Sequence, residues 1–266
     1  MGKWALMLAG LLLAGGSTQP VYAWGKNGHR IVAEIADDNL SGEARARIEQ
    51  ILGRELLEDA ANWPDEMRSS PDDYWQHEAG PYHYVTVPMG STYSDTVPPT
   101  EGDALTALAG FRATLRDPSA PLEDRRHALR FALHIIGDLH QPLHAGNGTD
   151  RGGNAVSVEF MGRTINLHSV WDTHMIEYQE LSYTEYADFL GRYLDPDHVI
   201  AWWKTDPLVW VGESTELRDR IYPSEPEIGY DYIFAHQDDL NRRLAMGGVR
   251  AAAWLNEVFR SDGAAH

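Results

Sequence analysis

Apolar residues recur at helical spacing along most of this chain. Between residues 28 and 53, Ile31, Ile35, Ile48 and Leu52 follow this spacing, and Ser41-Gly42 interrupts the pattern. The pattern predicts a helix with a break at that dipeptide. By the same criterion, further helices are predicted at 105–115, 122–139, 168–177, 184–193 and 233–259.

One segment shows the alternation of a β-strand. Apolar and polar residues alternate from Val156 to Phe160, Met161-Gly-Arg163 supplies a turn, and the pattern continues from 164 to 167. These features predict a small β-hairpin. Residues 69–100 are rich in Pro, Ser, Thr and Tyr without a period, so we expect a loop region. The chain shows neither an internal repeat nor a long linker, and the predicted class is all-α: one helical domain with a small β-hairpin.

The first 23 residues have the pattern of an export signal. A short basic start precedes an apolar run from 4 to 13, and a small-residue stretch ends in Val21-Tyr22-Ala23, which fits a signal peptidase site. The apolar run of about ten residues is too short to span a bilayer. We therefore expect residues 1–23 to be a cleaved signal peptide and residues 24–266 to be the mature domain. The protein would be periplasmic or secreted, without a membrane contact after cleavage.

Composition limits the chemistry that is available to the chain. The sequence contains no cysteine, which excludes disulfides, cysteine nucleophiles and thiolate zinc sites. Any bound metal must therefore be held by His, Asp or Glu. The formal net charge of −18 argues against a protein that holds nucleic acid on a basic face.

The candidate chemistry is concentrated between His134 and His144. His134 and Asp138 are four residues apart on a predicted helix, so their side chains project from the same face. A proline ends that helix, and the turn after it can return His144 to the same face. His168 and Asp172 repeat the four-residue spacing. Imidazole and carboxylate groups without thiolate are common zinc ligands, so the sequence predicts a zinc site.

His140 lies in the same segment, but its helical phase points away from His134 and Asp138. A histidine in an apolar helix is more often a packed residue, hydrogen-bonded to a neighbour, than a metal ligand. We therefore assign His140 to packing.

Together with further motifs, this segment resembles the single-strand-specific zinc nucleases of fungi and plants, the S-one/P-one nuclease type. These enzymes share a fold with bacterial zinc phospholipase C. The resemblance spans the whole mature chain, and the lack of cysteine fits a bacterial-type member. The motifs are Trp24-Gly-x-x-Gly-His29, His134-x-x-x-Asp138-x-His-Gln-Pro-Leu-His144, Arg151-Gly-Gly-Asn154, Asn166-Leu-His168, Val170-Trp-Asp172 and Arg243-Leu-Ala-x-Gly-Gly-x-Arg250.

The resemblance implies three zinc ions per chain, two of them close together and one apart. The ligands of the first ion would be Asp65, His83 and His134. Those of its close partner would be His29 and the amino nitrogen and carbonyl oxygen of Trp24, with Asp138 bridging the two ions. The ligands of the separate ion would be His144, His168 and Asp172.

The resemblance also implies roles in catalysis and substrate binding. Asp138 would act as the bridging ligand, and Arg68 would contact the phosphate. Tyr84 would stack on a base, whereas Asn154 would either contact the substrate or build its own turn. Three zinc ions against three ligand carboxylates would make the cleft locally positive inside an acidic protein. Thr86 stands where fungal members place an acidic residue that reads the base edge, so the resemblance implies no base preference.

The implied function is a zinc-dependent endonuclease that hydrolyses single-stranded DNA and RNA to 5′-phosphate products, with 3′-nucleotidase activity as a further expectation. Single-stranded nucleic acid and nucleotides would be its partners, and the protein would act as a monomer without a protein partner. One alternative is a phospholipase C-like zinc phosphodiesterase that acts on lipid phosphate esters. The other is a non-catalytic zinc-binding periplasmic protein. Paired, dispersed ligands and the match of Arg68, Tyr84 and the Gly-Gly-Asn turn favour the nuclease.

Overall fold

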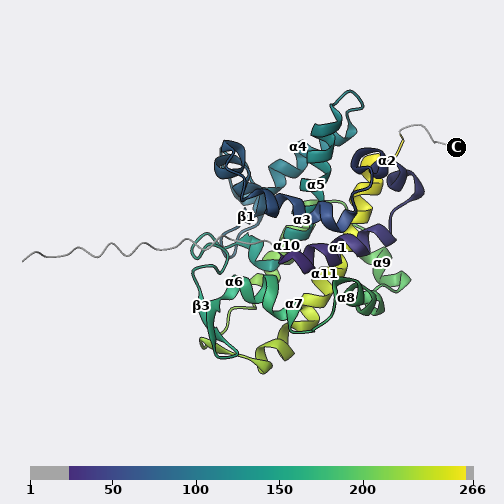
Figure 1. Ribbon diagram of the computed structural model, residues 1–266. Helices are drawn as coiled ribbons and strands as arrows, with labels where there is room; N and C mark the ends of the chain where they lie inside the picture. Colours follow the sequence, from purple (N-terminus) through teal and green to yellow (C-terminus); the bar gives the residue numbers. More distant parts are fainter. Residues whose placement is uncertain (1–23, 262–266) are drawn as a thin grey trace, which may run out of the picture.

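Helices form most of the structure, a computed structural model that describes residues 24–261 (Figure 1). The predicted signal peptide lies outside the described residues. The all-α class with a small hairpin is confirmed. Within the described residues, no helix has both the length and the apolar character needed to cross a membrane.

Four helices enclose the interior around α5. The helix α1 (Lys26–Asp38) packs against α11 (Tyr230–Phe259) and α3 (Leu57–Met67), and α5 (Leu122–Asp138) packs against α3 and α4 (Ala104–Arg116). The predicted helices at 105–115, 122–139 and 233–259 agree with α4, α5 and α11 to within a few residues. The second half of α5 is therefore covered on all sides.

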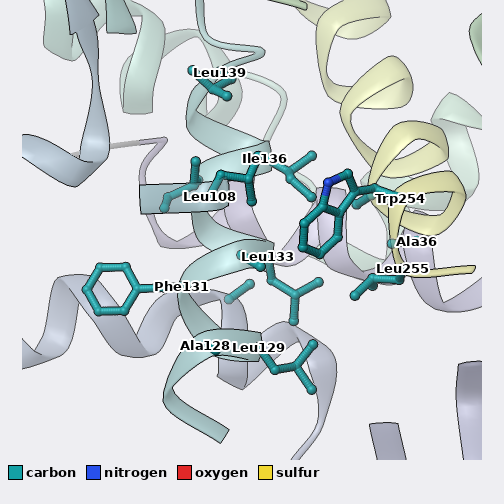
Figure 2. Close-up of a cluster of buried hydrophobic side chains, with 14 of the residues drawn as sticks. Ala36, Leu108, Ala128, Leu129, Phe131, Leu133, Ile136, Leu139, Trp254 and Leu255 are labelled. Carbon is teal, nitrogen blue, oxygen red and sulfur yellow. The ribbon is translucent and has the colours of Figure 1, made fainter. Parts of the chain in front are cut away.

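The core beside α5 is closely packed. Figure 2 shows Leu133 and Ile136 of α5 next to Trp254 and Leu255 of α11, and all four side chains are almost inaccessible to solvent. Burying one such side chain stabilises the fold by about 1.5–3 kcal/mol. Every residue from 131 to 138 is buried, so the polar His134 and Asp138 require partners inside the core.

The predicted break near Ser41 is present. Ser41 caps α2 (Gly42–Leu52) by accepting a hydrogen bond from the backbone of Ala44 at 3.1 Å. The predicted helix 168–177 is a continuous helical segment that widens in its middle. Its three pieces are α6 (Leu167–Ser169), the π-helical turn η5 (Val170–His174) and α7 (Met175–Glu177).

Three helices were not predicted from the sequence. The helix α3 contains Pro64, a residue that disfavours a helical interior. The helices α9 (Pro196–Trp202) and α10 (Pro207–Arg218) each begin with a proline after a capping aspartate. A proline at the first helical position behind a capping aspartate is a start signal that could have revealed both.

Within residues 24–261, the strands form two small sheets. The predicted hairpin consists of β3 (Ser157–Phe160) and β4 (Arg163–Asn166), and β5 (Glu227–Ile228) adds to β3 in parallel. The second sheet was not predicted: β1 (Val85–Thr86) pairs in parallel with β2 (Ala145–Gly146). This pairing brings the segment after His83 next to the segment after His144.

The remaining helical segments are short. Residues 69–100, predicted to be a loop region, contain β1 and three short helical turns, which are η1 (Tyr74–Glu78), η2 (Gly80–His83) and η3 (Tyr93–Asp95). The other short segments are η4 (Pro142–His144), α8 (Tyr183–Leu190) and η6 (Gly191–Tyr193).

Candidate metal centre and substrate pocket

In the part of the chain that the structure describes, histidine and aspartate side chains converge in three groups. Within each group, the candidate ligand atoms lie within 4.8 Å of one another. The first two groups share His134 and are therefore adjacent. The groups are His29, His134 and Asp138; Asp65, His83 and His134; and His144, His168 and Asp172. The structure thus brings together every side chain of the ligand set expected from the resemblance.

Asp138 lies between the two adjacent groups. Its Oδ1 is 3.4 Å from Nε2 of His29. Its Oδ2 is 3.3 Å from Nδ1 of His83 and 3.2 Å from Nε2 of His134. One fully buried carboxylate therefore faces histidines of both groups, as a ligand that bridges two cations must.

Backbone carbonyl groups orient three of these histidines. A carbonyl oxygen only accepts, so the Nδ1 atom next to it must carry the proton. When such a ring is neutral, it keeps a lone pair on Nε2 for a metal, an arrangement that is common in metalloproteins. The pairs are His134 with Ala61 at 2.7 Å, His144 with His83 at 2.5 Å, and His168 with Gly152 at 2.6 Å.

Several polar atoms of the groups are buried without a hydrogen-bond partner in the described chain. They include Nε2 of His29, Nε2 of His144 and Oδ1 of Asp138. Leaving such an atom unpaired costs about 1–3 kcal/mol, and more for a charged group. A divalent cation among them would satisfy these atoms. The donor set of imidazole and carboxylate without thiolate fits zinc.

Burial and mutual charge determine the protonation of the groups. Burial lowers the pKa of His144 to about 3, which keeps this imidazole neutral. Burial raises the pKa of Asp172 to about 7. Burial alone would also lower the pKa of His134, but the carboxylates of Asp138 and Asp65 raise it to about 9. Because ligands bind metal without their protons, a cation entering these groups would displace the proton of His134.

Trp24 is fixed beside His29 and Asp138. Its buried indole Nε1 donates to the carbonyl of Gly137 at 2.7 Å. A Cβ atom on Gly28 would come within 2.9 Å of the Trp24 side chain, so only glycine lets α1 approach this closely. The next residue, Gly25, donates its backbone N–H to the carbonyl of Asp172 at 2.7 Å. The start of the described chain is thereby held against the candidate metal centre.

Arg68 lies against the second group. It follows α3 directly, and its Nη1 atom is 3.2 Å from Oδ1 of Asp65. The Arg68 side chain is partly exposed, whereas that of Asp65 is almost buried. Arg68 is therefore fixed at the edge of the centre and keeps further N–H groups on its planar guanidinium.

A pocket of about 320 Å³ opens beside the third group. Tyr84 is half-exposed and lies at its wall, together with Thr86 of β1. The loop that follows β2 lies close to Thr86, because a Cβ atom added to Gly148 would be 3.2 Å from the Thr86 methyl group. The lining residues are Tyr84, Thr86, Leu143, His144, Gly146, Gly148, Thr149, Arg151, Gly152 and His168.

Asn154 has a partner within its own turn. Its side-chain amide donates to the carbonyl of Arg151 at 2.9 Å, and Asn154 is not among the residues that line the pocket. The turn-building role left open by the sequence is therefore present in the structure. A substrate contact for Asn154 stays a prediction.

Gln141 and Gly152 support the site, although the sequence assigned neither of them a role. Gln141 lies in the segment from His134 to His144, and Gly152 lies in the Arg151-Gly-Gly-Asn154 turn. The buried amide of Gln141 donates to Oδ1 of Asp172 and accepts from the backbone N–H of Leu143. Gly152 has a φ of 60°, and a Cβ there would lie 2.3 Å from the Leu143 carbonyl oxygen. Only glycine fits this position, from which its carbonyl orients His168.

Arginines of α11 hydrogen-bond to the chain directly after α5, and a glutamate of α10 binds both arginines. Arg243 donates from Nε to the carbonyl of His140 at 3.0 Å, and Glu213 accepts from Arg243 at 2.9 Å and from Arg250 at 2.8 Å. His140 faces this cluster, with its Nε2 3.2 Å from Arg250, and belongs to none of the three candidate metal-binding groups. This agrees with its assignment to packing.

Comparison with known proteins identifies relatives of the whole described chain. The profile of the S1/P1 Nuclease family matches residues 24–260. The chain is 30% identical to Endonuclease 4 of Arabidopsis thaliana over 279 aligned residues, which cover 90% of each protein. It is 30% identical to Nuclease S1 of Aspergillus oryzae over 275 residues, covering 90% of this chain and 93% of the relative.

A third relative is Nuclease P1 of Penicillium citrinum, which is 29% identical over 285 residues. That alignment covers 90% of this chain and 99% of the relative. Because the family profile matches nearly all of the described chain, this protein belongs to the S1/P1 nuclease family.

Proposed function

We propose that this protein is a zinc-dependent endonuclease that hydrolyses single-stranded DNA and RNA to 5′-phosphate products and also acts as a 3′-nucleotidase. The observation that carries this proposal is the position of Asp138, one buried carboxylate between two groups of histidines. The third group, at the wall of a pocket with an exposed tyrosine, supports a nucleotide as the substrate. The names of the relatives support a nuclease rather than a lipase.

Three zinc ions would be held by the three groups, with the amino nitrogen and carbonyl oxygen of Trp24 completing the group of His29. Zinc bound there would supply Lewis acidity and lower the pKa of a bound water to about 7. Asp138 would hold the paired sites at a fixed spacing. Arg68 would donate its remaining N–H groups to the substrate phosphate while Asp65 keeps its guanidinium in place.

Residues 1–23 would be an export signal, and the protein would act as a periplasmic or secreted monomer. The start of the family match at residue 24 supports cleavage after Ala23. Cleavage would release the Trp24 amine next to His29. The substrate partners would be single-stranded nucleic acid and nucleotides, with no protein partner required.

A panel of phosphate esters tests the proposed activity. Single-stranded DNA, RNA, a 3′-nucleotide and phosphatidylcholine are assayed side by side, before and after zinc is removed by a chelator and restored. We expect hydrolysis of the first three substrates, loss with the chelator and recovery with zinc. Hydrolysis of phosphatidylcholine alone would indicate a phospholipase. Zinc binding without any hydrolysis would indicate a non-catalytic zinc protein.

Tyr84→Ala is expected to weaken the binding of single-stranded substrates. The half-exposed ring can stack only on a base that has left its duplex partner, and such stacking favours binding by about 5- to 140-fold. KM for a single-stranded oligonucleotide should rise with a smaller change in kcat. Tyr178→Ala, at a tyrosine of similar exposure outside the pocket, is the control. Equal rates of the unaltered protein on matched single- and double-stranded oligonucleotides would contradict the single-strand preference.

A further inference from the structure

Arg151 is a positively charged residue of the pocket beside Tyr84 that has no role in the proposed metal centre. It is exposed and lines the pocket together with His144 and His168. Its backbone carbonyl accepts the Asn154 amide, whereas its guanidinium makes no hydrogen bond or ion pair with any residue of the described chain. Apart from the two histidines, Arg151 is the one ionisable cation of the lining, which contains no carboxylate. In a protein with a net charge of −18, this pocket is therefore lined by a cation without a neighbouring carboxylate in its wall.

The neighbouring acid, Asp150, forms no ion pair with Arg151 within the described chain, and its carboxylate is bonded to other groups. One carboxylate oxygen of Asp150 accepts the backbone N–H of Gly153 at 3.0 Å. The other accepts the hydroxyl of Tyr222 at 2.6 Å and the side-chain amide of Asn147 at 3.1 Å. These bonds fix the loop that carries Arg151 while they occupy the carboxylate of Asp150.

The backbone of Arg151 is in an unfavourable conformation for a residue with a side chain. Its φ is 57°, and the next two residues, Gly152 and Gly153, also have positive φ values. Glycine would adopt this conformation at position 151 with less strain. Strained residues of this kind are concentrated at functional sites, which directs attention to the side chain of Arg151.

We propose that Arg151 reads the base of the bound nucleotide and favours guanine. This inference rests on the proposed function, because it concerns the base that stacks on Tyr84 in the same pocket. A guanidinium carries only donors, arranged as a planar fork. Guanine presents two adjacent acceptors, O6 and N7, whereas adenine and cytosine present an amino donor and uracil a single carbonyl at the corresponding edge. The fork of Arg151 therefore matches guanine best.

Nucleosides separate base recognition from phosphate recognition, since they carry no phosphate. The binding of guanosine, adenosine, cytidine and uridine to the zinc-loaded protein is measured by calorimetry, and kcat/KM is measured for the four 3′-nucleotides. We expect the unaltered protein to prefer guanosine. Arg151→Gln should lower its affinity for guanosine, and kcat/KM for the guanine nucleotide, by about tenfold, with smaller changes for the other bases.

Two further variants sharpen the test. Arg151→Lys keeps the charge but loses the fork, so the guanine preference should also disappear. Arg47→Gln removes an exposed arginine on α2 with no place in the pocket, and it should leave the preference unchanged. Circular dichroism establishes that each variant is folded.

The possible outcomes are distinct. Equal losses for all four 3′-nucleotides, with full rescue by lysine, would assign Arg151 to the phosphate and overturn the proposal. An unchanged guanine preference in Arg151→Gln would overturn it as well. A guanosine preference that depends on Arg151 supports the base contact even if no substrate is hydrolysed, and in that case the proposed nuclease function alone would fail.

Discussion

Asp138→Asn is expected to abolish hydrolysis while the fold is preserved. Asparagine has nearly the same shape as aspartate, but its amide cannot offer two anionic oxygens to the histidines on either side. Changes in residues that merely orient a metal ligand cost about 10- to 100-fold in metal affinity or activity, so replacing a bridging ligand should cost more. Zinc content by elemental analysis and turnover on single-stranded DNA measure the effect.

The matched control is Asp59→Asn, the same chemical change at an exposed site on α3. It should retain full zinc and full activity. Far-ultraviolet circular dichroism distinguishes loss of the site from loss of the fold. If Asp138→Asn kept near-native turnover with all of its zinc, Asp138 would not be a bridging ligand.

One extra residue before Trp24 should remove one zinc ion per chain and most of the activity. The proposed ligand is the terminal amine of Trp24, whose reference pKa of about 7.7–8.0 allows it to lose a proton and bind metal. An added alanine converts this amine into a peptide nitrogen, whose lone pair is delocalised into the carbonyl. Trp24 is fully buried and its indole is bonded to Gly137, so the chain cannot easily shift to present a different amine.

The experiment compares a protein that begins at Trp24 with one that begins at an added alanine. A third protein carries the alanine at its C-terminus and should behave like the first. Zinc per chain and the rate of hydrolysis are measured for all three. Three zinc ions and equal rates in the first two proteins would show that the terminal amine is not a ligand.

Local pattern was sufficient to predict much of the helical fold. The period of apolar residues located α5 and α11 because both are long, and many turns repeat the same signal. The break at Ser41 was recognisable from its residue types. The helix α3 was missed because Pro64 opposes the helical assignment and only tertiary packing against α1 and α5 overrides it.

Residue type and spacing also determined the candidate ligands. His134 and Asp138, like His168 and Asp172, are neighbours on one helical face whatever the rest of the chain does. The resemblance extended the set to His29, Asp65 and His83, and the structure places all of these side chains in the three groups. Their occupation by zinc stays a proposal.

Only the tertiary structure decided how the pocket is built. The strand β1 pairs with β2 over just two residues, Val85 opposite Ala145 and Thr86 opposite Gly146. Such short strands carry no readable period, and the partners are 60 positions apart in sequence, so no local pattern could reveal this pairing. Yet the pairing places Tyr84 beside His144, and the loop after β2 leaves the guanidinium of Arg151 without a partner among residues 24–261. The sequence determined which groups this protein has for its chemistry, whereas long-range packing determined which of them face the substrate.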